Sequence, residues 1–470
     1  MGFRGAQGKS LGVASGGNSV HFGVHHLHPP VTHQRPKNRV APSTSTPPLR
    51  RRRRAVRGGD AQGPRRTALY PNGHVDCMHK SERLRVLNTL TEHLAKGTTA
   101  DAGGIMRVPM SDFTCPQLFT QEQDVFFRNT PLCMGLSSEL PEPNTYWSDN
   151  ATGLPILMVR DGGGTFRAYA NVCRHRGSKV VLEGHGSKTR FTCPFHAWTY
   201  GIDGRLLKVY KDSQFGNVSN MNLSLIALPS AEVHGTLWVR PTQGDPVDED
   251  ECLSGLQEDL AHWNLSEHTV AGTQIIDARM NWKLVVDSYG EIYHLNVLHA
   301  KTAAKEALGN LQTIDTFRNN LRMVVANQKL NLMRFSMPNM EHWPYKQITV
   351  TTYFFYPNVL MMVDTFGVDL LRIFPLEDSP GKSRTIHTWY IHPNVRKIFK
   401  THGRSYEDRL RTFRDAVGKE DYAMGEDVQL NAEMGVQSEI LLGRNEGALH
   451  HFHNAHRSGI GRDLLPVEGA

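Results

Sequence analysis

The chain has 470 residues, with 53 Lys and Arg against 46 Asp and Glu, and 39% of its residues are hydrophobic. The first 66 residues hold 13 basic side chains and one acid, Asp60, so the other 404 residues carry 40 basic and 45 acidic side chains. This balance excludes a basic nucleic-acid-binding body, and no apolar run approaches the roughly 20 residues that span a bilayer. Six cysteines are too few for a disulfide scaffold.

Residues 1–77 form a basic extension that includes five consecutive arginines, Arg50 to Arg54. Apolar periodicity is absent, so we expect this extension to be disordered. It is either an organellar targeting peptide, a nucleic-acid or localisation segment, or an extension upstream of a start at Met78. The prolines favour the last interpretation, because they disrupt an amphipathic helix. We expect a cytoplasmic protein with no membrane or nucleic-acid partner.

Three further segments are predicted from the pattern of apolar residues and turns. Residues 78–112 contain an amphipathic helix at about 81–94, and residues 113–241 alternate short apolar stretches with glycine-rich turns typical of β-hairpins. Residues 242–470 predict an α+β domain with a strand-rich centre. Its expected helices are Trp282–Ala300, Tyr406–Gly418 and one from near Glu426, and its expected strands are Ile348–Tyr356, Leu360–Thr365 and Ile386–Ile391.

The all-β segment contains two arms that each pair a cysteine with a histidine, Cys173-Arg-His175 and Cys193-Pro-Phe-His196. A zinc ion can take all four side chains, although its usual spacings are Cys-x-x-Cys or Cys-x-x-His. A Rieske [2Fe–2S] cluster binds two thiolates on one iron and two imidazoles on the other, so each arm must supply one of each. The order of ligands matches the cluster. The other four cysteines are interpreted as plain thiols, and His185 as solvent-facing.

The stretches Asn171–Gly177 and Cys193–Tyr200 resemble the Rieske motif of the large (α) subunits of Rieske-type non-haem iron ring-hydroxylating oxygenases. Electron-transfer Rieske proteins share the four ligands, so this motif alone does not define an oxygenase. Ala197 stands where the family more often has glycine. The resemblance implies a small all-β Rieske [2Fe–2S] domain followed by a helix-grip catalytic domain, an antiparallel sheet with helices.

A second group of ionisable residues lies about 95 residues further on, with Asp287, Glu291, His294 and His299 in an otherwise apolar segment. On a helix the first three would form one polar stripe, which is costly to bury unless something binds it. The two histidines are five residues apart, about 140° around an ideal helix, so a loosened turn is needed for both to reach one metal. Taken alone, they can equally be structural histidines near a helix end.

Downstream of a Rieske motif, Glu-x-x-His-x-x-x-x-His resembles the mononuclear iron site of the same family, where two histidines and one carboxylate bind Fe(II). The third ligand comes from later in the chain, and the candidates are Asp421, Glu426 and Asp427. Asp427 is favoured, because Leu430 and Met434 follow at helical spacing and would place it on a buried face. The resemblance also implies that Glu291 hydrogen-bonds His294 and reaches His196 of a neighbouring subunit, with Asp287 as a supporting acid.

The predicted function is that of a terminal oxygenase, an oxidoreductase that uses O2 and electrons relayed through the cluster to hydroxylate an aromatic or alicyclic substrate by mono- or dioxygenation. The alternatives are N- or O-demethylation, oxidation of a quaternary ammonium compound, and electron transfer without oxygenase activity. No Gly-x-Gly-x-x-Gly fingerprint follows a strand, so we expect a separate NAD(P)H-dependent reductase, with or without a ferredoxin. The resemblance implies a homotrimer or an α3β3 assembly. Methionines within residues 321–343 and 353–373 can line an apolar pocket or form plain core.

Overall fold

The computed structural model describes residues 78–469, apart from residues 183, 219–220, 301–306, 378 and 402–404. The predicted disordered extension, residues 1–77, lies outside the described residues. Contacts divide the chain into Met1–Thr67 and Ala68–Ala470, and all described residues belong to the second unit. Among the helices that the structure describes, none combines the length and apolar character needed to cross a bilayer.

The N-terminal helix forms as predicted, with Val86, Leu87 and Leu90 buried along one stripe. It ends at Gly97, whose φ of 64° is the left-handed conformation that glycine adopts without strain. The next strand pairs on both sides with strands from the C-terminal end of the chain, so this segment is joined to the catalytic part by backbone hydrogen bonds. The elements are α1 (Lys80–Lys96), β1 (Ile105–Pro109), α2 (Ser111–Thr114), α3 (Pro116–Asp124) and the π-helix η1 (Val125–Asn129), with β20 and β21 as the partners of β1.

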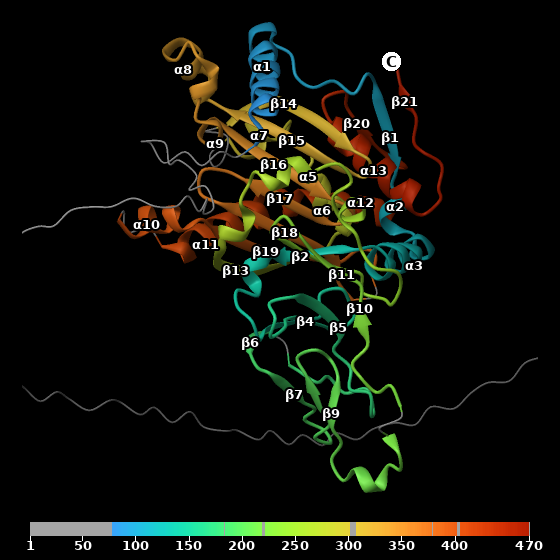
Figure 1. The fold of residues 1–470 in the computed structure, drawn as a ribbon. Helices are drawn as coiled ribbons and strands as arrows, with labels where there is room; N and C mark the ends of the chain where they lie inside the picture. Colours follow the sequence, from blue (N-terminus) through green and yellow to red (C-terminus); the bar gives the residue numbers. More distant parts are fainter. Residues whose placement is uncertain are drawn as a thin grey trace, which may run out of the picture. The chain divides into compact units, whose positions relative to one another are not determined.

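The predicted β domain contains a five-stranded sheet, β10-β5-β4-β3-β6, and two three-stranded sheets, β11-β12-β2 and β7-β8-β9 (Figure 1). The predicted hairpins form at Asp161–Gly164 and at Asp203-Gly204, where Gly164 and Gly204 have positive φ. Residues 113–129 are largely helical, so the first strand of this region begins only at residue 132. The strands are β2 (Leu132–Leu136), β3 (Thr145–Asp149), β4 (Ile156–Arg160), β5 (Phe166–Ala170), β6 (Gly184–Ser187), β7 (Arg190–Thr192), β8 (Thr199–Gly201), β9 (Leu206–Lys208), β10 (Ala227–Leu228), β11 (Ser230–Val233) and β12 (Thr236–Val239), with 3-10 turns η2 (Ser137–Glu139) and η3 (Asp212–Gln214).

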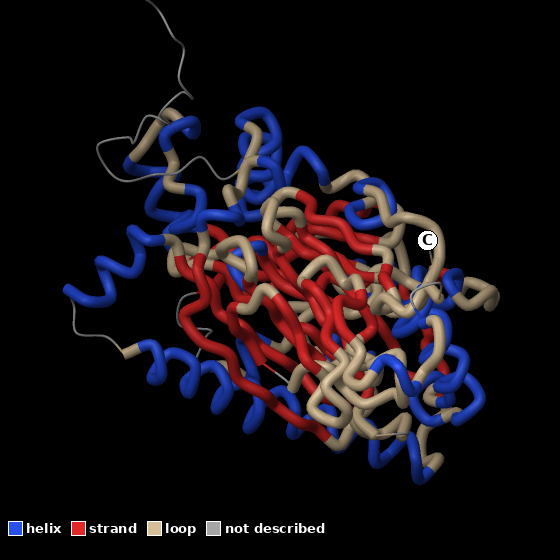
Figure 2. The backbone as a smooth tube through the Cα atoms, turned by 60° about the horizontal axis from the view of Figure 1, so that its bottom comes forward, coloured by secondary structure: helices blue, strands red, loops and turns tan. Residues whose placement is uncertain are grey.

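The second part is built on a seven-stranded antiparallel sheet in the order β13-β19-β18-β17-β16-β15-β14, and Figure 2 shows the strands at the centre with helices around them. The three strands predicted here are confirmed as β16, β17 and β19, and the α+β fold class is confirmed. The elements are α4 (Glu249–Leu253), α5 (Gln257–Ala261), η5 (Leu265–Glu267), β13 (Thr269–Ala278), α6 (Trp282–Asp287), α7 (Leu295–Leu298), β14 (Ala307–Phe317), β15 (Asn320–Asn327), α8 (Lys329–Ser336), η7 (Met340–His342), α9 (Tyr345–Ile348), β16 (Thr349–Phe355), β17 (Val359–Val363), β18 (Val368–Pro375), β19 (Ser383–Ile391), α10 (Pro393–Thr401), α11 (Tyr406–Ala416), the π-helix η8 (Val417–Asp421), α12 (Tyr422–Met434), β20 (Glu439–Leu442), α13 (Gly447–Gly459) and β21 (Val467–Glu468).

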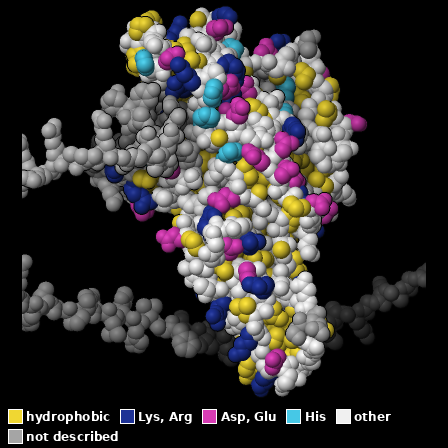
Figure 3. All heavy atoms as spheres, in the orientation of Figure 1, with side chains coloured by type: hydrophobic (Ala, Val, Ile, Leu, Met, Phe, Trp, Pro, Cys, Tyr) yellow, Lys and Arg dark blue, Asp and Glu magenta, His cyan; other side chains and the backbone are white. Residues whose placement is uncertain are grey.

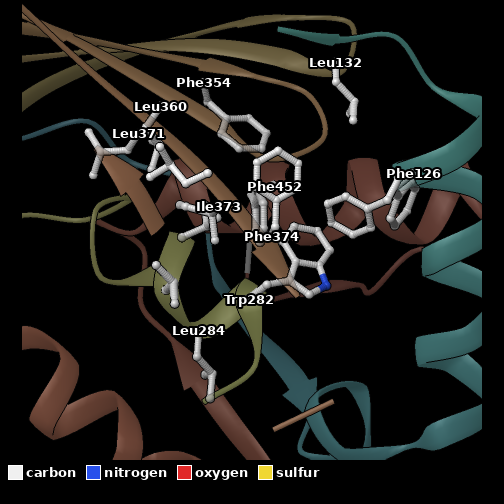
Figure 4. Packing of buried hydrophobic residues seen from close by; sticks show 14 of the residues in the cluster. Phe126, Leu132, Trp282, Leu284, Phe354, Leu360, Leu371, Ile373, Phe374 and Phe452 are labelled. Atoms are coloured by element: carbon white, nitrogen blue, oxygen red, sulfur yellow. The ribbon is translucent and has the colours of Figure 1, made fainter. Parts of the chain in front are cut away.

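The two faces of this sheet pack into different cores, because alternate side chains of a strand point to opposite faces. On one face Phe354 belongs to the cluster that contains Trp282 of α6 and Phe452 of α13 (Figure 4). On the other face Tyr353 and Phe355 pack in a cluster that includes Leu87 of α1. Helices α6 and α13 are therefore held on one side of the sheet, and the candidate metal ligands lie in and next to this layer.

Candidate functional site

The four predicted Rieske ligands lie in two turns with the same backbone pattern. In each turn the cysteine carbonyl accepts a backbone N–H four residues on, from Gly177 to Cys173 at 2.9 Å and from Ala197 to Cys193 at 3.0 Å. Both closing residues have positive φ, 77° for Gly177 and 58° for Ala197. The alanine therefore takes the same left-handed conformation that glycine would take, and the second turn keeps the shape of the first.

The side chains of these turns converge as a metal centre requires. Cys173 and Cys193 are buried, and the imidazole rings of His175 and His196 have centroids 4.6 Å apart. The Nδ1 atom of His175 is buried without a hydrogen-bond partner among the described residues. Burial raises the pKa of the Cys193 thiol, although the backbone N–H groups of Phe195 and His196 partly offset this effect. A buried pair of thiols ionises when a cation binds beside it, so the two turns fit an iron–sulfur centre.

Aromatic side chains lie next to this centre. The ring of Trp198 stacks on His175 with centroids 5.0 Å apart, and Tyr200 places its hydroxyl 3.4 Å from the Cys173 Sγ. The prediction that His185 is not a ligand agrees with its position, because it is half-exposed and its Nε2 lies 2.8 Å from Glu139. The cluster position is thus shielded from one side by apolar rings.

The predicted single helix over Trp282–Ala300 is wrong. Helix α6 ends at Asp287, an irregular segment follows, and α7 begins at Leu295. This interruption supplies the loosened turn that the five-residue spacing of the histidines requires. As a result the rings of His294 and His299 meet edge to face, with centroids 5.1 Å apart.

Asp421 is the acid that the structure places between these histidines. Its Oδ1 lies 3.0 Å from His299 Nε2 and 3.4 Å from His294 Nε2. One ligand atom from each of the three residues fits within 4.8 Å, and no other group of this kind occurs among the described residues. Burial raises the pKa of Asp421, and the two histidines offset this effect only in part. Two imidazoles and one carboxylate at one point are the donor set of a mononuclear iron site with open positions.

The preference for Asp427 is wrong in this structure. Asp427 is exposed, and the residues that were expected to mark its buried face, Leu430 and Met434, are 53% and 68% exposed. The other candidate, Glu426, pairs with Arg279 at 3.0 Å outside the three-residue cluster. The helical pattern was misread because α12 buries Tyr422, Gln429 and Ala432 and leaves Leu430 and Met434 exposed, and because the π-helix η8 precedes it and changes the helical phase.

His294 and His299 each have a glutamate at the other ring nitrogen, Nδ1. Glu291 hydrogen-bonds His294 Nδ1, as predicted, and Glu420 Oε2 lies 2.6 Å from His299 Nδ1. Burial lowers the pKa of His294, but the hydrogen bond and charge of Glu291 outweigh burial and raise it. Sequence reasoning missed Glu420. Its one signal was its position directly before Asp421.

Asp287 does not lie beside the cluster histidines, and its Oδ1 instead lies 3.0 Å from Nε2 of His453 on α13. It supports the site by tying α6 to α13. Three histidines of α13, His450, His453 and His456, are buried. His456 contacts the carbonyl oxygens of Phe452 and Pro357, and burial lowers its pKa to about 3.

A pocket of about 510 Å³ opens beside the three-residue cluster. Its described lining includes four acids and contains no Lys or Arg. Burial raises the pKa of one of them, Glu446, and the charges of Glu291 and Asp287 raise it further. Its lining includes Asp287, Glu291, Tyr293, His294, Val297, Asp421, Met424, Glu446 and Leu449.

A second, apolar cavity lies behind Leu449, which lines both spaces. Tyr289, Phe354 and Phe452 contribute to its wall. Of the methionines that the sequence singled out, Met323 lines this cavity, whereas Met361 packs in the core on the opposite face of the sheet. Of the two interpretations of these methionines, plain core fits Met361, and Met323 borders the cavity.

Comparison with known proteins agrees with both halves of the chain. A family model described as Rieske [2Fe-2S] domain matches residues 130–221, and one described as ring hydroxylating alpha subunit (catalytic domain) matches residues 265–461. The two matches cover more than half of the chain. The protein belongs to the Rieske-type ring-hydroxylating oxygenase α-subunit family, and its two cofactors are a [2Fe–2S] cluster and a mononuclear iron.

Curated relatives include the glycine betaine monooxygenase oxygenase subunit of Chromohalobacter salexigens, 32% identical over 44% of this chain and 46% of that protein. The carnitine monooxygenase oxygenase subunit of Acinetobacter baumannii is 31% identical over 41% of this chain and 52% of its own length. The matched segment thus spans about half of these relatives. The chloroplastic choline monooxygenase of Spinacia oleracea is 27% identical over 73% of this chain and 76% of that protein.

Solved structures share the fold. A quaternary ammonium Rieske monooxygenase in complex with L-carnitine aligns with a TM-score of 0.62 and 21% identity, covering 77% of this chain and 97% of that chain. A naphthalene 1,2-dioxygenase with indole bound aligns with a TM-score of 0.59 and 16% identity, covering 77% and 93%. At these identities the likeness establishes the architecture alone.

Proposed function

We propose that this protein is the terminal oxygenase of a Rieske system, with Cys173, His175, Cys193 and His196 holding the cluster and His294, His299 and Asp421 holding the mononuclear iron. The observation that carries the proposal is the convergence of two Nε2 atoms on one buried carboxylate in a chain that also carries paired Cys-His turns. When bound, the cluster relays single electrons and the open-site Fe(II) activates O2.

The protein's own residues prepare this centre. Glu291 and Glu420 each bind Nδ1 of one iron-site histidine. Nε2 of both rings is therefore directed at Asp421. The surrounding layer of α6 and α13 excludes water from one side, because the neighbouring cavity is lined almost entirely by apolar side chains. The substrate would enter through the acidic pocket, because His294 and Asp421 form part of its wall.

A quaternary ammonium compound is the substrate class that we favour. The pocket beside the iron ligands has four carboxylates and no basic side chain in its described lining, which suits a cation. Relatives over part of the chain are named for glycine betaine, carnitine and choline. Aromatic hydroxylation is the second candidate, because apolar side chains such as Val297, Met424 and Leu449 also line this pocket.

Metal analysis of two matched variants tests the site. Purified protein should contain about two acid-labile sulfides and about three irons per chain, as one cluster and one mononuclear site require. Asp421→Ala should lose about one iron and keep the cluster spectrum, whereas Asp427→Ala should keep all of its iron. Loss of iron from the Asp427 variant alone would identify Asp427 as the third ligand. Zinc without acid-labile sulfide would contradict the assignment of a [2Fe–2S] cluster.

A substrate screen tests the reaction. The enzyme is supplied with a surrogate reductase and NADH, and products are identified by mass spectrometry with labelled O2. Labelled product or released trimethylamine from a quaternary ammonium compound supports the favoured class. Labelled hydroxylation of aromatic compounds alone would establish the second candidate instead. The separate reductase, with or without a ferredoxin, is part of the same proposal.

A further inference from the structure

His299 lies between two consecutive acids of another part of the chain. Asp421 Oδ1 is 3.0 Å from its Nε2, and Glu420 Oε2 is 2.6 Å from its Nδ1. The imidazole is only 6% exposed, so water has little access to either nitrogen. Both acids come from η8, the π-helical turn between α11 and α12. Such wide turns are found most often at functional sites, because they present side chains that a regular helix would separate.

The arrangement repeats at the other histidine. His294 also directs Nε2 at Asp421 and has a glutamate, Glu291, at Nδ1. The sources of the two glutamates differ: Glu291 lies three residues before its histidine, whereas Glu420 reaches His299 from 121 positions further along the chain. One glutamate is thus a local feature of the sequence, and the other exists only in the folded protein.

A neutral imidazole that binds a metal through Nε2 must carry its proton on Nδ1. In a buried ring this N–H needs an acceptor, and the acceptor decides which nitrogen keeps a lone pair for the metal. A carboxylate is the strongest such acceptor because the hydrogen bond is charge-assisted. Without that carboxylate, His299 would lose the acceptor at Nδ1 that favours the tautomer with a lone pair at Nε2.

We propose that Glu420 is a positioning residue that fixes His299 in the tautomer and ring orientation required to bind the mononuclear iron. This inference rests on the proposed function, because it takes His294, His299 and Asp421 as the iron ligands. The π-helical turn η8 then contributes twice to the site: Asp421 binds the iron, and Glu420 orients His299.

The test measures metal binding rather than turnover. Full-length protein with an intact cluster is freed of mononuclear iron and titrated anaerobically with Co(II), whose ligand-field bands report the donor set. Glu420→Leu should weaken Co(II) affinity by about 10- to 100-fold, the usual effect of losing a histidine's outer partner. Glu420→Gln should lose less, since its amide oxygen still accepts from Nδ1, and should shift the bands. Glu426→Gln, which removes one negative charge from α12, should bind as wild type.

Three outcomes distinguish the role of Glu420 from the assignment of the iron ligands. If His299→Ala and Asp421→Ala bind Co(II) as wild type, the ligand assignment fails and the inference fails with it. If both lose Co(II) while Glu420→Leu keeps wild-type affinity and spectrum, only the inference is overturned. Should Glu420→Leu not fold, as shown by loss of the cluster spectrum, Glu420→Gln decides the question through its affinity and band positions.

Discussion

Glu291 holds His294 from the side of the molecule where another chain can approach. Its carboxylate bonds His294 Nδ1 and accepts the His294 backbone N–H at 3.2 Å. The neighbouring side chains Tyr293 and Val297 are 67% and 82% exposed. A carboxylate has about four acceptor sites, so Glu291 can accept a further hydrogen bond from an imidazole of another subunit, which we expect to be His196.

Glu291→Gln should therefore separate electron transfer from iron binding. The amide oxygen can still accept from His294 Nδ1, so the variant should retain its cluster and most of its iron, but the charge that joins two imidazoles is lost. We expect slower cluster reoxidation when the pre-reduced variant is mixed with O2 and substrate in a single turnover. Glu439→Gln, at an exposed pair with Arg107, is the control.

Reoxidation and product formation at the wild-type rate in the Glu291 variant would exclude the carboxylate from the electron path. Loss of iron without a change in cluster content would instead make Glu291 a ligand, and the three-residue cluster around Asp421 would need to be revised.

At the scale of elements, the sequence predicted those parts of the site whose residues lie close together along the chain. Cys173 and His175 belong to one turn, so their pairing and that of the second arm were visible in the order of residues. Asp421 was weighed but not preferred, because it meets His299 across 122 positions and through a π-turn that no periodic pattern announces. Tertiary packing, not local propensity, decides where α12 is buried.

The segment between α6 and α7 comes close to α13 at Gly290. A Cβ placed there would lie 2.2 Å from Leu449 Cδ2, so an added methyl group forces the Leu449 side chain to move. Gly290→Ala should lower the free energy of unfolding by about 1–3 kcal/mol, the usual cost of overpacking. It should also weaken mononuclear iron binding, because Leu449 and the histidine segment border the same pocket.

Gly418→Ala in η8 is the matched control for this variant, since no atom lies within 4 Å of its added Cβ. Urea unfolding followed by the cluster absorbance gives the midpoints of both proteins. Equal midpoints would show that α13 accommodates the extra methyl group without a cost in packing.

At the scale of the whole molecule, the two metal centres lie on surfaces of opposite character. The cluster turns expose Arg176, Pro194 and Phe195, which we call the cluster surface, and the iron pocket is rimmed by carboxylates with exposed Tyr293 and Val297. Figure 3 shows Lys and Arg side chains among hydrophobic ones at the lower end of the molecule, and acidic, basic and His side chains mixed over the part above it. Opposite charges on the cluster surface and the pocket rim would favour contact between copies of the chain.

Mixed oligomers test whether electrons pass between subunits. A Cys173→Ser chain lacks the cluster and an Asp421→Ala chain lacks the mononuclear iron, so each alone should be inactive. Co-expressed with two different tags and purified through both, they should regain activity if the cluster of one chain serves the iron of its neighbour. Each cyclic trimer that carries both tags has two chains of one kind and one of the other, so one of its three donor–acceptor pairs is intact and the recovery should be about a third of wild type. Complete inactivity of mixed oligomers that contain both tags, with cluster and iron each at half occupancy, would mean that each cluster serves the iron of its own chain.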